Sequence, residues 1–464
     1  MKKSFSSLII LSLLSVQSSL GQNKSISSES LNKYRSQCIS SPSDNALNNA
    51  VAVNGLKILA TSANNTSYDT YFSNKVESKG ITNQLKSGRC WLFTGLNVMR
   101  AKVIAKHHLG KFSFSQNYCF FYDQLEKSNL FLQSIIDNAQ KPMDDRLIEW
   151  LFKNPISDGG QFTGISDIVT KYGLVPSDVM PETYTSNNTS DYARIISLKL
   201  REYGLKLREM AANGAKEKEM MTKKEEMLGT VYRILVRCFG LPPQKFTWTM
   251  KDSKGIPVST KEYTPLSFYQ EFVGTDLKNG YVMFMNDPTR PFYKAYQIDL
   301  DRHSYDGQNW TYVNVPMDEI KKMAIQSIKD STMMYLSCDV AKELDSKKGF
   351  EDAGNYNYTD LLGTDFPMNK KERIQTFASG SSHAMTLMAV DLDESSKPIK
   401  WMVENSWGED YGYKGHIIMT DKWFDEYVFR LVVEKKYVPQ NLLNIIGKKP
   451  TLLPAWDPMF CPEP

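Results

Sequence analysis

The chain has 464 residues, which is long enough for a large core and two or three structural units. It is 41% hydrophobic and 23% charged, as is ordinary for a globular protein, and this composition excludes the disordered and fibrous classes. The formal net charge of +4 is too small on this length to indicate a nucleic-acid-binding protein.

The N-terminus has the pattern of an export signal. Lys2 and Lys3 precede an apolar run from Phe5 to Val16, and Ser19-Leu20-Gly21 offers the small residues that a signal peptidase favours. The apolar run is too short to span a bilayer, and no other stretch approaches the length of a membrane helix. We therefore expect residues 1–21 to be a signal peptide and the mature protein to be periplasmic or extracellular. A buried N-terminal helix is the alternative.

The cysteines are widely scattered, and none belongs to a CxxC pair. This spacing favours neither a zinc site nor a dense disulfide scaffold. An oxidising compartment would allow one or two disulfides, but the sequence does not assign their pairing. The six are Cys38, Cys90, Cys119, Cys238, Cys338 and Cys461.

Residues 22–60 and the polar segment 63–78 predict an arm or a loop-rich entry, which leads to the stretch Gln84-Leu-Lys-Ser-Gly-Arg-Cys90. Cys90 is expected at the N-terminus of a helix, where unpaired N–H groups and the helix dipole stabilise a thiolate, the nucleophilic form. The Gln84 amide and the Cys90 N–H could both donate to an oxyanion on a substrate carbonyl. A packing cysteine is the alternative. The helix is indicated by apolar residues at helical spacing, Leu92, Leu96, Met99 and Val103.

Two segments follow the nucleophile helix. The apolar and aromatic run 113–131 predicts a core helix. Further on, Gly159 and Gly160 permit a close backbone approach that side chains would block, which suits a strip of main chain that binds an extended peptide. An ordinary turn is the alternative for this pair.

A charged helical hairpin is predicted between residues 193 and 239. Its outer face suits either solvent or a second subunit, and the sequence leaves both open. The next part of the chain is predicted to hold short strands and turns at 246–315 with a clear strand at 281–285, a helix at 316–329, a strand at 333–338 and an irregular segment at 340–371.

Of the five histidines, His383 is the best candidate for a base that serves Cys90. It ends a flexible polar loop and opens the apolar strand 386–390, so it is placed to reach across to a thiolate. Of the other four, His107 and His108 follow the nucleophile helix at its far end. His303 lies in a polar loop, and His416 lies within an alternating strand.

Asn405 follows in the segment Val403-Glu-Asn-Ser-Trp407-Gly408. An asparagine can hydrogen-bond an imidazole and fix its orientation, and Trp407 would shield that bond from water. A turn asparagine beside a core tryptophan is the alternative.

These segments, in this order, resemble the papain superfamily of cysteine peptidases. The form Gln84, Ser87-Gly-Arg-Cys90-Trp91 is similar to its bleomycin hydrolase and aminopeptidase C branch. The resemblance implies an α+β, two-lobed papain-like fold, with a helical lobe, an antiparallel β lobe and an inserted helical hook.

The resemblance also implies roles for the candidate residues. Cys90 attacks the scissile carbonyl, His383 takes and returns the proton, and Asn405 orients His383. Gln84 and the Cys90 N–H hold the oxyanion, and Gly159 with Gly160 lines the substrate cleft. No metal or organic cofactor is required by this chemistry.

The interval from Cys90 to His383 is about twice the ~130 to 150 residues expected of papain and the cathepsins. The extra length must be insertions, and the helical hairpin is the obvious one. In the branch such insertions form a hook that is used in ring-shaped hexamers. We expect a signal peptide at 1–21, an arm and helical lobe with the nucleophile at 22–160, the rest of that lobe with the hook at 161–345, a β lobe at 346–449 and a C-terminal arm at 450–464.

The tail Leu453-Pro-Ala-Trp-Asp-Pro-Met459 also resembles the branch, in which the terminal carboxylate enters the cleft and meets the free amine of the substrate. Here that carboxylate belongs to Pro464, and the ending Phe460-Cys-Pro-Glu-Pro464 departs from the short small-residue ending that is usual there.

The predicted function is therefore a cysteine-type aminopeptidase that acts on short peptides, in a homohexamer and without a membrane span. An endopeptidase or transpeptidase with the same site is the enzymatic alternative. A catalytically idle scaffold or binding protein is the alternative from another class, and the modest net charge gives nucleic acid little support as its partner.

Overall fold

The structure is a computed structural model, and it describes residues 24–38, 41–457 and 459. The predicted signal peptide, Cys461 and Pro464 lie outside the described residues. The chain divides into two units, Met1–Thr61 and Ser62–Pro464.

The first unit contains three helices, α1 (Ser28–Gln37), α2 (Pro42–Val53) and α3 (Leu56–Leu59). A loop-rich entry is wrong for this part of the segment, because serines cap the first two helices. Ser27 accepts from the N–H of Ser30, and Ser41 forms a capping box with Asp44. None of the three helices has a buried residue.

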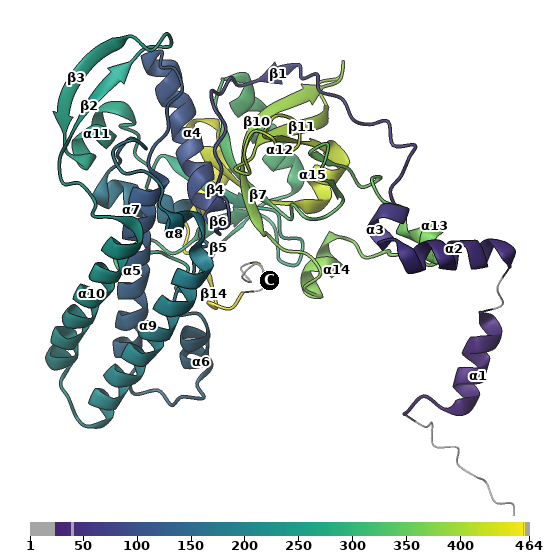
Figure 1. Ribbon diagram of the computed structural model, residues 1–464, viewed down its shortest axis with the longest axis horizontal. Coiled ribbons are helices and arrows are strands. Elements are labelled where there is room, and N and C mark those ends of the chain that lie inside the picture. Colours follow the sequence, from purple (N-terminus) through teal and green to yellow (C-terminus); the bar gives the residue numbers. More distant parts are fainter. Residues whose placement is uncertain (1–23, 39–40, 458, 460–464) are drawn as a thin grey trace, which may run out of the picture. The chain divides into compact units, whose positions relative to one another are not determined.

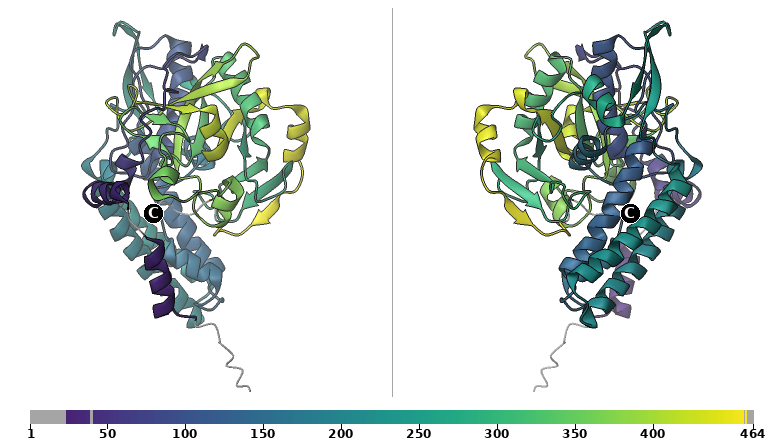
Figure 2. Two further views of the ribbon diagram at one scale, coloured as in Figure 1. Left: turned by 90° about the vertical axis from the view of Figure 1, so that its right-hand side faces the viewer. Right: turned by 90° about the vertical axis from the view of Figure 1, so that its left-hand side faces the viewer.

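The second unit holds the predicted core helix and the predicted hairpin. The core helix is α5 (Gln116–Asp137), and the hairpin consists of α9 (Thr189–Ala212) and α10 (Glu217–Phe239). All three helices pack together and run side by side away from the sheet (Figures 1 and 2). The other helices of this part are α4 (Cys90–His107), α6 (Arg146–Lys153), α7 (Phe162–Tyr172) and α8 (Tyr184–Asn187).

A twelve-stranded sheet forms the other half of this unit (Figure 1). Its central order is β4-β13-β7-β10-β11-β12, with mostly antiparallel pairs and three parallel ones, β4 with β6, β12 with β9 and β14 with β5. The strands are β1 (Asn74–Lys75), β4 (Tyr281–Met285), β5 (Lys294–Ile298), β6 (Thr311–Asn314), β7 (Met334–Cys338), β8 (Leu344–Asp345), β9 (Phe350–Glu351), β10 (His383–Leu392), β11 (Pro398–Glu404), β12 (His416–Thr420), β13 (Val428–Glu434) and β14 (Thr451–Leu453).

Strands β4 to β8 precede residue 346, so the sheet draws on a longer part of the chain than the β lobe that we expected. The domain boundaries themselves stay a prediction. A separate hairpin lies outside the sheet and consists of β2 (Phe246–Lys251) and β3 (Pro257–Tyr263). The remaining helices are α11 (Pro265–Phe272), α12 (Met317–Lys329), α13 (Tyr358–Leu362), α14 (Lys370–Gln375), α15 (Asp421–Tyr427), the 3-10 helix η1 (Lys435–Tyr437) and α16 (Gln440–Ile446).

Two segments differ from their predictions. The segment 340–371 is not wholly irregular, because β9 pairs with β12, a partner that only the tertiary fold supplies. Helix α11 lies in a region predicted to hold only strands and turns. Its start was readable, since Thr264 caps it and Pro265 occupies its first turn.

The contact between α4 and β10 positions the candidate site. The Thr386 hydroxyl of β10 donates to the carbonyl of Thr94, one turn into α4, at 3.5 Å. Both residues are buried. The start of the helix and the start of the strand therefore face each other across the junction of the helical part and the sheet (Figure 1).

Candidate active site

Cys90 is the first residue of α4 and is 8% exposed. The residue before it, Arg89, is fully buried and pairs with Glu182 at 2.9 Å. The thiol thus lies at the positive end of an 18-residue helix. This position favours the thiolate over the thiol.

His383 and Asn405 are hydrogen-bonded, with 2.9 Å between His383 Nε2 and Asn405 Oδ1. The same oxygen accepts from the N–H of Ser406 at 2.8 Å, which identifies it as the amide oxygen. Nε2 must therefore carry the hydrogen, and Nδ1 is the ring nitrogen that can accept a proton. The Trp407 ring covers the imidazole, with 4.7 Å between the ring centroids.

Burial controls the basicity of His383. Its pKa is lowered to about 4 because the buried ring is cut off from water, while the bond to Asn405 opposes the shift. A neutral imidazole near pH 7 is the form that takes a proton from a thiol.

Cys338 of β7 links the surroundings of His383 to those of Cys90. His383 lies opposite Cys338 in the pairing of β10 with β7. Burial raises the pKa of the Cys338 thiol well above its usual range, and the charges of Glu351, Asp339 and Cys90 add to this effect. Cys90 therefore lies within electrostatic range of the residue that pairs with His383.

Gln84 is tied to the segment that follows Asn405. Its Oε1 accepts from the Ser406 hydroxyl at 2.6 Å, and its N–H donates to the Ser406 carbonyl at 2.8 Å. One amide hydrogen on Nε2 goes to the Ser87 carbonyl at 2.6 Å, which leaves the second for an oxyanion. Ser406 thus fixes Gln84 and Asn405 together. Sequence reasoning gave Ser406 no role, although it lies inside the segment that was singled out.

Gly159 and Gly160 lie in the loop before α7, beside the start of the nucleophile helix. The neighbouring Asp158 joins the two, since its carbonyl accepts from the Trp91 indole at 2.8 Å and its carboxylate accepts from the N–H of Gly88 at 2.7 Å. Gly160 is exposed, and within the described chain neither its N–H nor its C=O has a hydrogen-bond partner. Such an edge can pair with an extended peptide.

The C-terminal arm reaches the same region. Arg430 of β13 donates to the carbonyl of Met459 at 2.9 Å and to the side-chain oxygen of Gln161 at 3.3 Å. Gln161 directly follows the glycine pair. Earlier in the arm, Asp457 is buried and pairs with Arg290.

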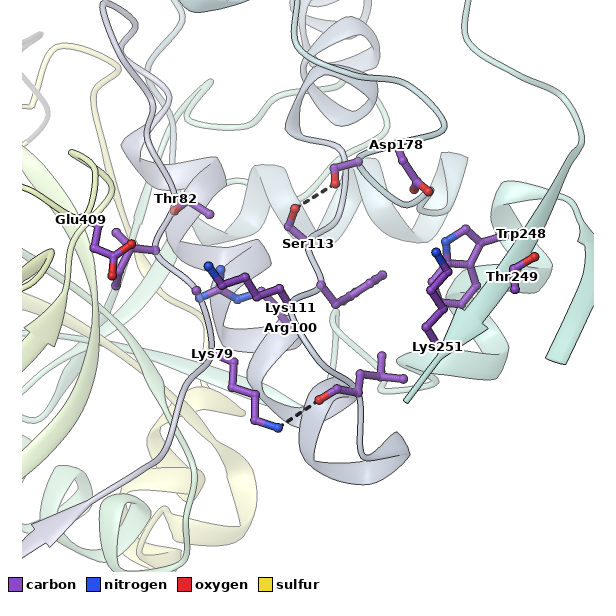
Figure 3. Close-up of a pocket in the computed structure, with 15 residues that line it drawn as sticks. Lys79, Thr82, Arg100, Lys111, Ser113, Asp178, Trp248, Thr249, Lys251 and Glu409 are labelled. Carbon is purple, nitrogen blue, oxygen red and sulfur yellow. Dashed lines mark hydrogen bonds between the residues drawn. The ribbon is translucent and has the colours of Figure 1, made fainter. Parts of the chain in front are cut away.

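A separate pocket of about 500 Å³ is lined in part by residues 79–82, the segment that leads to Gln84 (Figure 3). Lys79, Lys111 and Lys251 contribute cations to its lining, and Asp178 and Glu409 contribute carboxylates. None of the predicted site residues that the structure describes lines it. Among the described residues there is no cluster of three or more histidine, cysteine, aspartate or glutamate side chains that could hold a metal ion.

The helical half, the sheet half and the residues at their junction define a papain-like cysteine peptidase. The chain belongs to the Peptidase C1-like family, which it matches over residues 25–460.

Its similar proteins include enzymes from animals and bacteria. It is 40% identical to the bleomycin hydrolase of Rattus norvegicus over 392 residues, which cover 82% of this chain and 86% of that one. It is 35% identical to the aminopeptidase C of Lactobacillus delbrueckii subsp. lactis over 443 residues, which cover 94% and 98%. The crystal structure of PepW from Lactobacillus rhamnosis HN001 superposes with a TM-score of 0.91 at 36% identity, covering 94% of this chain and 99% of PepW.

Proposed function

We propose that this cysteine peptidase is an aminopeptidase that removes N-terminal residues from short peptides. The single observation that carries the chemistry is the bond between His383 and Asn405, which leaves Nδ1 of His383 as the proton acceptor at the strand start that faces α4. The similarity to aminopeptidase C supports the choice of an N-terminal substrate.

In the proposed reaction, Cys90 attacks the scissile carbonyl while His383 takes the thiol proton. The Cys90 N–H and the second Nε2 hydrogen of Gln84 stabilise the oxyanion. His383 then protonates the leaving amine, and water hydrolyses the acyl enzyme with His383 as the base. Cys90 and His383 together carry no net charge before the attack. The N-terminus of α4 stabilises the thiolate that forms when the proton moves to His383.

The C-terminal arm supports the restriction to N-terminal residues. Arg430 bonds both the Met459 carbonyl and Gln161. The arm therefore reaches the end of the strip of main chain formed by Gly159 and Gly160, which we call the glycine strip. We propose that the residues after Met459, including the carboxylate of Pro464, meet the free amine of the substrate.

The test uses matched fluorogenic peptides with a free or an acetylated amine, under reducing conditions, with Cys90→Ala as the control. Cleavage of the free-amine peptide alone, lost in the control, is expected. Cleavage of both peptides would make the protein an endopeptidase. Cleavage of neither, with Cys90 still open to alkylation, would favour a latent form or a scaffold.

We further propose that the chain is exported and assembles into a homohexamer. The charged pattern and apolar run of residues 1–21 support export. The outer face of α9 supports assembly, because Ile195, Leu198 and Leu205 are each more than half exposed there. Cell fractionation with N-terminal sequencing tests the first proposal. Sedimentation of the wild type beside Leu198→Glu tests the second, and a monomer in both would reject it.

Within the described residues no helix is long and apolar enough to cross a membrane.

A further inference from the structure

A lysine lies beneath the glycine strip. The ammonium of Lys127, in α5, donates to the Gly159 carbonyl at 2.6 Å and to the Ser157 carbonyl at 3.1 Å. Its third partner is the Asp123 carboxylate, one helical turn earlier, at 3.0 Å. Three acceptors match the three hydrogens of an ammonium, so the group is held in one place.

The geometry of one peptide unit links Lys127 to the substrate edge. The Gly159 carbonyl and the Gly160 N–H belong to the same peptide group, and no peptide bond in the described chain is cis. In a trans peptide these two dipoles point in opposite directions. A cation on the carbonyl therefore turns the Gly160 N–H away from α5, and hydrogen-bond polarisation through the peptide strengthens that N–H as a donor.

His303 completes the support. Its Nδ1 lies 2.5 Å from Asp123 Oδ1, and burial lowers the pKa of the ring, so the imidazole is neutral and donates to the carboxylate. The ring packs against Gly160 and Gly164, where a Cβ atom would collide with it. It also contacts Trp91, the neighbour of Cys90, with 4.7 Å between ring centroids.

We propose that Lys127 is a positioning residue for substrate binding, which fixes and polarises the Gly159–Gly160 peptide so that Gly160 can hydrogen-bond the peptide chain of the substrate. Asp123 holds Lys127 in place, and His303 supports the inner side of the strip. This inference rests on the proposed function of the glycine strip as the substrate edge.

The alternative is that Lys127 only stabilises the helical half. The two roles differ in what they change. A positioning role weakens peptide binding and leaves chemistry at Cys90 intact, whereas a purely structural role lowers stability and affects binding only through unfolding.

The experiment measures binding and turnover separately. In the Cys90→Ala background, fluorescence anisotropy gives the Kd of a free-amine peptide with a C-terminal fluorophore. In the active enzyme, kcat and KM are measured for the same peptide series. Lys127→Met is expected to raise Kd and KM about tenfold, the scale of one hydrogen bond between the Gly160 N–H and the substrate, with kcat within about twofold.

Two further variants keep the test independent of folding. Lys127→Met leaves Asp123 without its cation, so the double variant with Asp123→Asn removes both charges and should regain stability while keeping the binding defect. Lys153→Met is the matched control, because Lys153 ends α6 and pairs with Glu149 on the surface.

Unchanged Kd in the folded double variant would overturn the inference, as would a fall in kcat without a change in Kd. If the wild type cleaves no peptide but the Cys90→Ala protein still binds one, and Lys127→Met weakens that binding, the proposed function fails and the inference stands.

Discussion

Two buried histidines serve different parts of this enzyme. His383 and His303 are 5% and 3% exposed, each has one ring nitrogen hydrogen-bonded, and burial lowers the pKa of both. Their partners differ, since Asn405 is a neutral amide and Asp123 is a carboxylate that is itself paired with Lys127.

The difference in partners matches a difference in surroundings. A neutral amide orients His383 without supplying a counter-charge, so the charge that forms on the ring during catalysis can be balanced by the thiolate of Cys90. His303 is packed between Gly160, Gly164 and Trp91, and its carboxylate partner is already balanced by a cation. These surroundings suit His383 to the proton exchange that we propose and His303 to the support of a loop.

The largest expected effect separates these roles directly. His383→Ala should lower kcat by about 10⁴-fold, because no base remains for the thiol. His303→Phe keeps the size of the ring and should hold kcat within about tenfold while KM rises. Steady-state kinetics with free-amine peptides gives both values, and equal losses of kcat in the two variants would contradict the division.

The next effect concerns the oxyanion. Gln84→Ala should lower kcat by about 10²- to 10³-fold with little change in KM, because its amide donates only when negative charge has formed. Gln297→Ala is a control, since that side chain of β5 bonds Thr311 on the neighbouring strand β6 and none of the described site residues. If Gln84→Ala raised KM and left kcat unchanged, Gln84 would contribute to ground-state binding of the substrate instead.

A third prediction concerns the pH dependence of stability. Unfolded histidine binds a proton near pH 6.5, but folded His383 does so only near pH 4. The folded state therefore loses stability relative to the unfolded state as pH falls from 6.5 to 4, by up to about 3 kcal/mol.

Urea unfolding of the wild type and His383→Ala at pH 7, 5.5 and 4 measures this effect. The difference in unfolding free energy between the two proteins should shrink or reverse as pH falls, because the alanine variant has no side chain at this position whose pKa changes on folding. Parallel pH profiles would show that the His383 pKa is not lowered in the folded protein.

The smallest effect concerns Asn405. Its bond raises the His383 pKa against burial, so Asn405→Ala should move the acidic limb of the kcat/KM profile to lower pH while reducing kcat about tenfold. Asn444→Ala, on a surface helix, is the control. An acidic limb that moves to higher pH would contradict the stated direction.

Much of the fold follows from local pattern. The helical spacing after Cys90 corresponds to α4, and the predicted hairpin and the strands at 281–285 and 333–338 are confirmed. Helices α1, α2 and α11 were missed because their start signals are short local capping motifs, which are weaker than a repeated apolar pattern.

The sequence by itself determined which residues carry reactive groups, since a thiol before an amphipathic helix, a histidine at a strand start and an asparagine before a tryptophan are local features. Only the tertiary structure decided how they are held. Ser406 bonds Gln84 over 322 residues of chain, and Asp123, which holds Lys127, bonds His303 over 180. Hydrogen bonds between segments so far apart depend on close packing of the whole chain, and no periodicity in the sequence reports them.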